Sequence, residues 1–318
     1  MSQGAYTSVR ELARLRYHAT GFSYLPKQPV GSVLSGRKRS RLRGRGLDFD
    51  ELRHYRPGDD IRTMDWKVTQ RTGQPYVRVF TEERDRPVWI LADQRLSMFF
   101  GSQYQLKSVA AADIAALTAW RVIAQGDRIG CLLFNDCEQY LAKPSRSPGK
   151  VMTWLAKLAA MNNALNADAT QSADASALER ALKKLAIHVH HDGLIVIASD
   201  FCGWNTGCLE AIKQMRQRND VICALVSDPL ERDISAAHKL VVSDGQFQLE
   251  IDPEHSDTQR RYRDDFIASY AAIAASLKRH AIPLFAIDTT ESVATQIQRQ
   301  LSGHSANRAA TASEARIK

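Results

Sequence analysis

Cysteine is scarce in this sequence, and its spacing argues against two kinds of structure. Only five cysteines occur among the 318 residues, at Cys131, Cys137, Cys202, Cys208 and Cys223. The number is odd, and no two of them lie at the Cys-x-x-Cys spacing that tetrahedral zinc sites favour. We therefore expect reduced thiols, as in a cytoplasmic protein, rather than a disulfide framework or a structural zinc site.

Long apolar runs are also missing. The first thirty residues lack an apolar segment of signal-peptide length. Nowhere does the chain hold the roughly 20 consecutive apolar residues of a membrane helix. A glycine-rich phosphate loop of the Walker type is absent too, which argues against an ATPase. These absences predict a soluble, cytoplasmic protein without a transmembrane segment.

Positive charge is concentrated in the first part of the chain. Of the net charge of +8, all the excess lies in residues 1–90, where 18 Lys and Arg face 10 Asp and Glu. Six cations crowd into the stretch 31–47, which is rich in Gly and Ser: Arg37, Lys38, Arg39, Arg41, Arg43 and Arg45. We expect a flexible basic loop there. Its charge suits nucleic acid or an anionic membrane, but no aromatic residues are interleaved to stack on bases, so nucleic acid is disfavoured.

From residue 87 onward, short apolar runs alternate with amphipathic segments. The apolar runs predict strands at Val88–Ala92, Ile129–Phe134, Leu194–Ala198, Val221–Val226 and Pro283–Ile287. Helical spacing predicts helices at Gln103–Ala124, Lys150–Met161, Ala177–Ile187, Cys208–Arg218, Arg260–Arg279 and Glu291–Leu301. This alternation is typical of an α/β domain with a doubly wound, mostly parallel sheet that helices cover on both faces.

Two segments depart from this alternation. Glu138–Ala142 follows the second strand after a short turn, which predicts one antiparallel edge strand. Lys239–Val242 and Phe247–Ile251 flank a Ser-Asp-Gly-Gln sequence, which predicts a β-hairpin inserted before the last long helix.

The chain therefore divides into five predicted parts. Residues 1–30 form an N-terminal helical segment, in which Tyr6–Thr20 has the spacing of a short amphipathic helix. The basic loop at 31–47 and a charged block at 48–86 follow. The α/β domain occupies 87–302, and residues 303–318, which are small, polar and without periodicity, form a disordered tail.

The charged block interleaves opposite charges with aromatic rings, and reads FDELRHYRPGDDIRTMDW from residue 49 to residue 66. A Pro-Gly pair followed by two aspartates is a strong turn signal, and Tyr76–Phe80 alternates as a strand should. The block's candidate functional residues are Arg53, Tyr55, Pro57, Gly58, Asp59, Asp60, Arg62, Asp65 and Trp66. We expect ion pairs to hold the block as a structural cap, with Trp66 in an apolar pocket. A docking surface or a small-molecule site is the alternative.

Residues 44–98 as a whole resemble the bacterial family known as domain of unknown function 58. Members join a block of the form GRGxxFDExRxYxPGDDxRxxDW to a von Willebrand factor type A domain, and this chain reads GRGLDFDELRHYRPGDDIRTMDW from residue 44. The resemblance implies a von Willebrand factor type A-like fold, which is a doubly wound, mostly parallel sheet with one antiparallel edge strand.

The resemblance also implies a site for a divalent cation, in an altered form. In such folds three loops at the carboxyl ends of the strands supply oxygen ligands, the first with the motif Asp-x-Ser-x-Ser. Here the first strand ends DQRLS at residues 93–97, so Asp93 and Ser97 match, and Arg95 stands in place of a ligand serine. By the same resemblance, Ser176 matches the second loop's threonine and Asp200 matches the third loop's aspartate.

Arg95 decides what this degenerate metal-ion-dependent adhesion site can do. A guanidinium has no acceptor atom, so it cannot serve as a ligand to magnesium. We expect Arg95 to act as an internal cation that pairs with Asp93 and Asp200, with no metal or other cofactor bound. Two alternatives stay open. Arg95 turns to solvent without a role, or a weak magnesium site survives on the four remaining oxygen-bearing residues, Asp93, Ser97, Ser176 and Asp200.

The resemblance implies a partner as well, because such proteins are commonly encoded with a MoxR-type AAA+ ATPase. We therefore expect a non-enzymatic adaptor whose degenerate site is a protein-docking surface, working with that ATPase in protein maturation or assembly. One alternative is a magnesium-dependent binding module or hydrolase. Another is a protein that binds nucleic acid or an anionic membrane through Arg37–Arg45. The sequence does not set the oligomeric state.

Overall fold

The computed structural model of the protein describes residues 4–19, 47–82, 86–166, 174–232, 240–243, 248–251 and 256–300. The basic run at residues 37–45 and the tail at residues 303–318 lie outside these segments, so what the sequence predicts for them stays a prediction. By its internal contacts, the chain divides into two units. The larger consists of Met1–Phe22 together with Arg86–Lys318, and the smaller is Ser23–Asp85.

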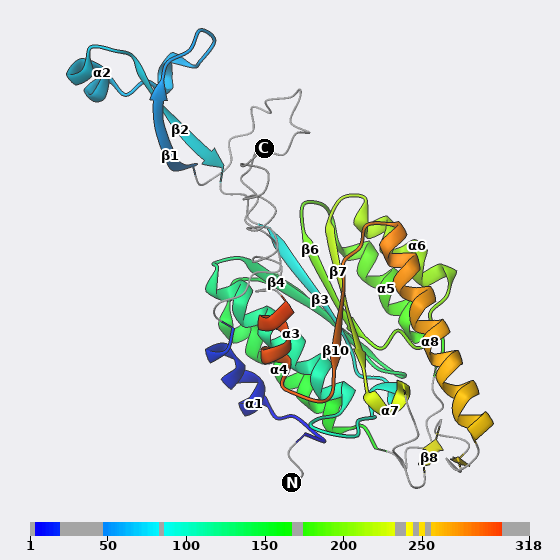
Figure 1. Cartoon of the computed structure of the whole chain (residues 1–318). Coiled ribbons are helices and arrows are strands. Elements are labelled where there is room, and N and C mark those ends of the chain that lie inside the picture. The colour runs from blue at the N-terminus through cyan, green and yellow to red at the C-terminus, as the bar shows by residue number, and fades with distance from the viewer. Residues whose placement is uncertain are drawn as a thin grey trace. The chain divides into compact units, whose positions relative to one another are not determined.

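The larger unit is built on a six-stranded sheet in the order β10-β7-β6-β3-β4-β5 (Figure 1). Its strands are Pro87–Asp93 (β3), Arg128–Phe134 (β4), Gln139–Ser145 (β5), Leu194–Ser199 (β6), Asp220–Ser227 (β7) and Leu284–Asp288 (β10). Neighbouring strands run parallel except at one edge, where β5 pairs antiparallel with β4. The predicted doubly wound, mostly parallel sheet with an antiparallel edge strand is therefore confirmed.

Helices cover both faces of this sheet. In Figure 1, α1, α3 and α4 lie on one side, and α5, α6 and α8 lie on the other. Their bounds are Val9–Arg14 (α1), Lys107–Ala124 (α3), Pro148–Asn163 (α4), Ala177–His188 (α5), Thr206–Arg216 (α6) and Ser256–Arg279 (α8). A single helical turn, Pro229–Arg232 (α7), follows β7, and residues 293–300 are helical. Because helices cover both faces, β3 and β6 are buried along almost their whole length, which explains their unbroken apolar runs.

The direction in which the strands are laid down reverses between β3 and β6. From β3 the chain adds β4 on one side, then crosses to β6 on the other side and continues outward to β7 and β10. At such a reversal the loops after the two strands diverge, and they leave a crevice at the carboxyl ends where this fold class binds ligands. Asp93 ends β3 and Asp200 directly follows β6, so the fold brings both to this crevice.

The N-terminal segment packs against α3 and α4. Helix α1 begins with a capping box, and a short 3-10 helix, η1 (Leu15–Tyr17), follows it. Leu12 is fully buried, and its carbonyl accepts a hydrogen bond from Trp120 Nε1 of α3 at 2.9 Å. The helix predicted at Tyr6–Thr20 is therefore present in a shorter form, because its N-cap comes only at Ser8 and its last turn tightens to the 3-10 type.

The smaller unit is an antiparallel pair of strands with two short helices between them. Its elements are Leu47–His54 (β1), Ile61–Thr63 (η2), Trp66–Thr72 (α2) and Tyr76–Glu82 (β2). β1 pairs with β2 from Leu47 to His54, with a bulge between Phe49 and Glu51. The strand predicted at residues 76–80 lies within β2, whereas the dense charges of the block conceal the strand pattern of β1.

Ion pairs hold this block together. Arg53 pairs bidentately with Asp59, at 2.8 and 2.7 Å, across a turn in which Gly58 takes a φ of +102°. That φ favours glycine, as the Pro-Gly turn signal indicates. Asp65 caps the start of α2 and also accepts a hydrogen bond from Arg78 Nε at 2.8 Å, and these contacts lower the pKa of its carboxyl.

The prediction that Trp66 lies in an apolar pocket is wrong, because this residue is 65% exposed. The reason is local. Asp65, the residue before it, is the buried one, because its carboxylate is engaged in the cap and in the pair with Arg78. Consecutive positions at the start of a helix lie about 100° apart around its axis, so burying one of them exposes the next.

A separate two-stranded sheet lies between β7 and α8 in the sequence. Leu240–Ser243 (β8) pairs antiparallel with Gln248–Ile251 (β9), and the residues that join them lie outside the described segments. Within the segments that are described, no helix is both long enough and apolar enough to cross a membrane.

Candidate functional site

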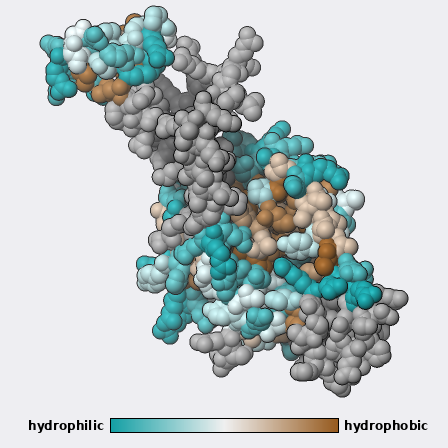
Figure 2. All heavy atoms as spheres, in the orientation of Figure 1, coloured by the Kyte–Doolittle hydropathy of each residue, from teal (hydrophilic) through white to brown (hydrophobic). Residues whose placement is uncertain are grey.

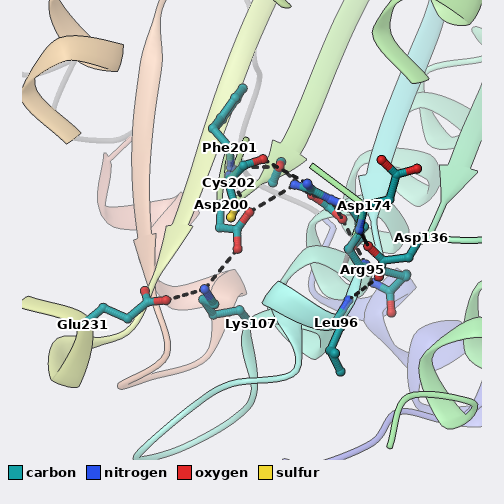
Figure 3. Close-up of polar contacts among 12 residues, drawn as sticks. Arg95, Leu96, Lys107, Asp136, Asp174, Asp200, Phe201, Cys202 and Glu231 are labelled. Atoms are coloured by element: carbon teal, nitrogen blue, oxygen red, sulfur yellow. Dashed lines mark hydrogen bonds and ion pairs between the residues drawn. The ribbon is translucent and has the colours of Figure 1, made fainter. Parts of the chain in front are cut away.

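The candidate site lies where the loops after β3 and β6 diverge. The β3 loop continues from Asp93 into a short 3-10 helix, η3 (Leu96–Met98), whose N-cap is Arg95. The β6 loop begins at Asp200 and passes Phe201, whose φ of +56° turns the chain sharply toward α6. Figure 3 shows side chains from both loops pointing toward one another.

Arg95 and Asp93 form a buried, multiply bonded ion pair. Arg95 Nε donates to both carboxylate oxygens, at 3.0 and 3.1 Å, and Nη2 donates to Oδ2 at 2.6 Å. The backbone N–H of Arg95 adds a bond to Oδ1 at 3.0 Å. The side chain of Arg95 is 3% exposed and that of Asp93 is 0% exposed, so both charges have left water and each depends on the other.

The same guanidinium reaches the second loop. Arg95 Nη2 lies 3.3 Å from Asp200 Oδ1, and Nη1 donates to the backbone carbonyl of Cys202 at 2.9 Å. One arginine side chain thus joins the carboxyl ends of β3 and β6. Arg95 is not turned to solvent, so this alternative from the sequence is wrong.

Lys107 is a second buried cation, and the sequence interpretation missed it. Its ammonium lies 3.1 Å from Asp200 Oδ2 and also pairs with Glu231 of α7 (Figure 3). Burial alone lowers the pKa of Lys107, but the two carboxylates outweigh it and raise this pKa above its ordinary value. Burial likewise raises the pKa of Asp200 on its own, yet Lys107 and then Arg95 bring it below its ordinary value.

A signal for Lys107 was present in the sequence. It is the first residue of α3, and the partial positive charge of a helix N-terminus disfavours a cation there. A lysine at that position, followed by a helix that is almost entirely apolar, indicates a carboxylate partner. The partners themselves lie 93 and 124 residues away in the sequence, so no local pattern names them.

The carboxylates of the site do not fit a magnesium ion. Oδ1 of Asp93 accepts two hydrogen bonds from Arg95, and Oδ2 accepts from Arg95 and from the hydroxyl of Ser199 at 2.6 Å. Asp200 gives Oδ1 to Arg95 and to the N–H of Cys202, and Oδ2 to Lys107. A dication would have to displace fixed positive charges from both carboxylates, because each of their oxygens already accepts a hydrogen bond from one of these cations.

Ser97 and Ser176, the other two predicted oxygen donors, are placed differently. Ser97 Oγ is buried and has no hydrogen-bond partner among the described residues. Ser176 is exposed, donates to Asp174 at 2.6 Å and accepts from Arg180. No hydrogen bond joins Ser176 to the Arg95 pairs, so the structure brings together Asp93, Arg95 and Asp200 but leaves Ser176 outside.

Asp136 is another residue that the sequence interpretation missed. It follows β4, and its carboxylate accepts the backbone N–H of Leu96 at 2.7 Å and that of Asp174 at 2.9 Å. It therefore fixes the β3 loop to the segment before α5. Its position at the carboxyl end of a parallel strand was the available signal, because loops at that edge converge.

A chain of buried amides connects the site to the N-terminal segment. Gln94 donates to the carbonyls of Asp93 and Ser108, at 2.9 and 2.8 Å. Its own side-chain oxygen accepts from Asn162 at 3.0 Å, and Asn162 accepts the N–H of Thr7 at 2.9 Å. These bonds also hold the β3 loop, and so fix the backbone that orients Arg95.

A cleft of about 620 Å³ opens beside the ion pairs. Its floor includes Ser97, Lys107 and Asp200, and its walls come from the β6 loop, the end of β7, and α8. A volume of this size lies within the range of ligand pockets in proteins.

Comparisons with known proteins agree with the sequence resemblance. A family model described as "Protein of unknown function DUF58" matches residues 51–275. The uncharacterized protein Rv1480 of Mycobacterium tuberculosis (strain ATCC 25618 / H37Rv) is 28% identical over 297 residues, covering 87% of this chain and 88% of the relative. The uncharacterized protein Mb1516 of Mycobacterium bovis shows the same identity and coverage.

Two solved structures are similar at low scores. The conserved hypothetical protein BatB from Bacteroides thetaiotaomicron has a TM-score of 0.40 at 12% identity, covering 69% of this chain and 98% of that one. The SpRpn10 VWA domain has a TM-score of 0.35 at 11% identity, covering 68% and 95%. The chain's own strand order, rather than these scores, defines its fold.

Proposed function

This chain belongs to the DUF58 family of proteins of unknown function, and we propose that it is a non-enzymatic adaptor that docks another protein at the crevice between β3 and β6. Docking does not require a metal ion there. The cation that joins the two loops of the crevice is Arg95, which belongs to the chain itself.

The single observation that carries this proposal is the buried contact of Arg95 with two loops. Its guanidinium neutralises Asp93 and Asp200 and also binds the carbonyl of Cys202. An internal cation cannot leave, so the two loops hold one arrangement at any magnesium concentration. A surface preformed in this way loses less conformational entropy when a partner binds.

The geometry gives less support to an enzyme. None of the described residues lining the cleft is a histidine, so its one thiol, Cys202, has no imidazole base beside it. Partial burial, and then the charge of Asp200, raise the pKa of the Cys202 thiol. A thiol with a raised pKa forms little thiolate at neutral pH and is a poor nucleophile.

The partner that we propose is a MoxR-type AAA+ ATPase, and the process is protein maturation or assembly in the cytoplasm. Support comes from the family, whose members are commonly encoded with such ATPases. Fold alone does not specify a partner, so the assignment depends on direct capture.

Affinity purification of the tagged full-length chain from its native host, with mass spectrometry of the recovered proteins, tests this function. The informative variant is Cys202→Arg, which adds bulk and charge at an exposed position on the β6 loop. The matched control is Gln217→Arg, exposed at the opposite end of α6. We expect the wild type and the control to recover the ATPase equally, and Cys202→Arg to recover at least about tenfold less, a loss of about 1.4 kcal/mol. Equal recovery with all three proteins would place docking elsewhere, and recovery of no AAA+ ATPase would refute the partner.

A further inference from the structure

We propose that the cleft beside the Arg95 pairs binds a partner segment that presents a lysine or arginine side chain next to an apolar one. This inference rests on the proposed docking function and names the chemistry that the docking surface recognises. It is carried by the walls, the floor and the mouth of the cleft.

The walls of the cleft are aromatic. Phe201 and Trp204 of the β6 loop pack edge to face, with ring centroids 5.6 Å apart. Phe266 and Tyr270 stand one helical turn apart on α8, with centroids 6.3 Å apart. All four rings line the cleft, and in Figure 2 hydrophobic residues gather over the neighbouring part of this unit, near β10 and α8. Such walls suit an apolar side chain or the methylene stem of a long basic one.

The floor of the cleft carries more negative than positive charge. The ion-pair network at the floor contains three carboxylates, Asp93, Asp200 and Glu231, and two cations, Arg95 and Lys107. Of these, Lys107, Asp200 and Glu231 line the cleft. The network therefore has a formal charge of −1 when all of its members are ionised. A cation at the floor reduces this imbalance, whereas an anion increases it.

An anionic ligand would find no free cation at the floor. Lys107 is 2% exposed and already pairs with both Asp200 and Glu231. An incoming carboxylate would therefore approach carboxylate oxygens as closely as the ammonium. Ser97 Oγ, by contrast, is buried without a partner among the described residues, and it offers an acceptor to an N–H donor.

The mouth of the cleft carries a further carboxylate. A cation–π contact beside it shows that a ring of the cleft can bind a cation. Asp265 of α8 lines the mouth, and no ion pair joins it to a described side chain. At the rim, the guanidinium of Arg232 lies 5.7 Å from the centroid of Tyr270, and its Nη2 donates to Ser227 at 2.9 Å. One ring of the cleft thus already binds a guanidinium by its face. The formal charges of Asp265 and Arg232 cancel. The net negative charge of the floor therefore favours a positively charged ligand.

Selection from a random heptapeptide phage library on the immobilised full-length chain tests this assignment. The informative variants are Trp204→Ala, which removes a wall, and Asp265→Lys, which reverses the charge at the mouth. Asp264→Lys is the matched control, because Asp264 is exposed, adjacent on α8, and does not line the cleft. We expect the wild type to select peptides with Lys or Arg beside an aromatic or aliphatic residue. The control should capture that pool equally, and each of the two cleft variants at least tenfold less.

Three results would overturn the assignment: selection of acidic peptides, selection of none, or a basic pool that the cleft variants capture as well as the wild type does. These results are separable from a failure of the proposed function. If the ATPase co-purifies but no cleft-dependent basic peptide is found, the proposed docking function is supported and the proposed preference for a basic ligand is refuted. If basic peptides bind the cleft but no ATPase co-purifies, the preference for a basic ligand is supported and the proposed partner is refuted.

Discussion

At the scale of single residues, a buried arginine is stable only where its charge is matched and its N–H groups are bonded. Arg95 meets both conditions. It pairs with Asp93 and Asp200, and its remaining terminal nitrogen reaches the carbonyl of Cys202. The same chemistry makes the site intolerant of change, because removing the guanidinium leaves Asp93 buried without a cation and Asp200 paired with Lys107 alone.

We predict that Arg95→Ala lowers the free energy of unfolding by about 3–5 kcal/mol, the usual cost of removing one partner of a buried ion pair. Urea denaturation followed by circular dichroism measures the change. Arg180→Ala is the control, because its side chain is 50% exposed in its pair with Asp174, and it should cost no more than about 1 kcal/mol. Similar losses in the two variants would mean that the Arg95 pairs are not the buried, multiply bonded contacts described above.

Trp66, unlike Arg95, is expected to tolerate substitution. Since its side chain is 65% exposed, we expect Trp66→Ala to change the free energy of unfolding by less than about 0.5 kcal/mol. Asp65→Ala, which removes the buried cap of α2 and the partner of Arg78, should cost about 1–2 kcal/mol. The same denaturation experiment ranks the two, and a larger loss for Trp66→Ala would show that this ring is buried after all.

At the scale of elements, α3 carries two charged side chains in different surroundings, the buried Lys107 and the half-buried Asp113. Lys107 at its start is matched by carboxylates from two other segments. Asp113, two turns later, has no hydrogen bond or ion pair to a described side chain. Burial raises its pKa to about 7, and Glu11 of α1 adds to the shift.

The raised pKa of Asp113 predicts that the free energy of unfolding depends on pH. Between its ordinary value of 3.8 and about 7, the unfolded carboxyl has lost its proton and the folded one keeps it. Stability from this group is therefore fully present below about pH 4 and is lost as the pH rises to 7. We expect Asp113→Asn to be more stable than the wild type at pH 8, by roughly 1–3 kcal/mol, and the difference to shrink toward pH 5.

Thermal or urea unfolding across this pH range measures the difference. Asp264→Asn, at an exposed position, should run parallel to the wild type throughout. A constant gap between Asp113→Asn and the wild type at every pH would contradict the assignment, because it would show that Asp113 has the same pKa in both states.

How far the sequence predicts the elements depends on how local their signals are. The parallel strands and the edge strand were predictable, because apolar runs buried on both faces differ plainly from amphipathic helices. The meeting of Asp93 with Asp200 was predictable too, since carboxyl ends of parallel strands share one edge. Lys107 and Glu231 were not predicted as a pair, because their contact depends on how α3 and α7 pack.

Ser176 shows the limit of motif matching. Its position before α5 fits the pattern of a second metal loop, but hydrogen bonds with Asp174 and Arg180 hold its hydroxyl locally. A sequence pattern specifies which residue occupies a position in a loop, but it does not specify which neighbour will form a hydrogen bond with that residue's hydroxyl.

At the scale of the whole molecule, the family match over residues 51–275 covers most of the described part of the smaller unit and most of the larger one. The family is therefore defined by the ion-paired block together with the α/β sheet, and not by the sheet alone.

The central claim is that Arg95 stands where a metal ion would otherwise be needed. Isothermal titration of magnesium into the wild type and into Arg95→Ser tests it most directly, because that variant restores Asp-x-Ser-x-Ser and removes the guanidinium from Asp93 and from Oδ1 of Asp200. We predict no binding heat above dilution for the wild type at millimolar magnesium, and measurable binding by Arg95→Ser. Tight magnesium binding by the wild type would contradict the account.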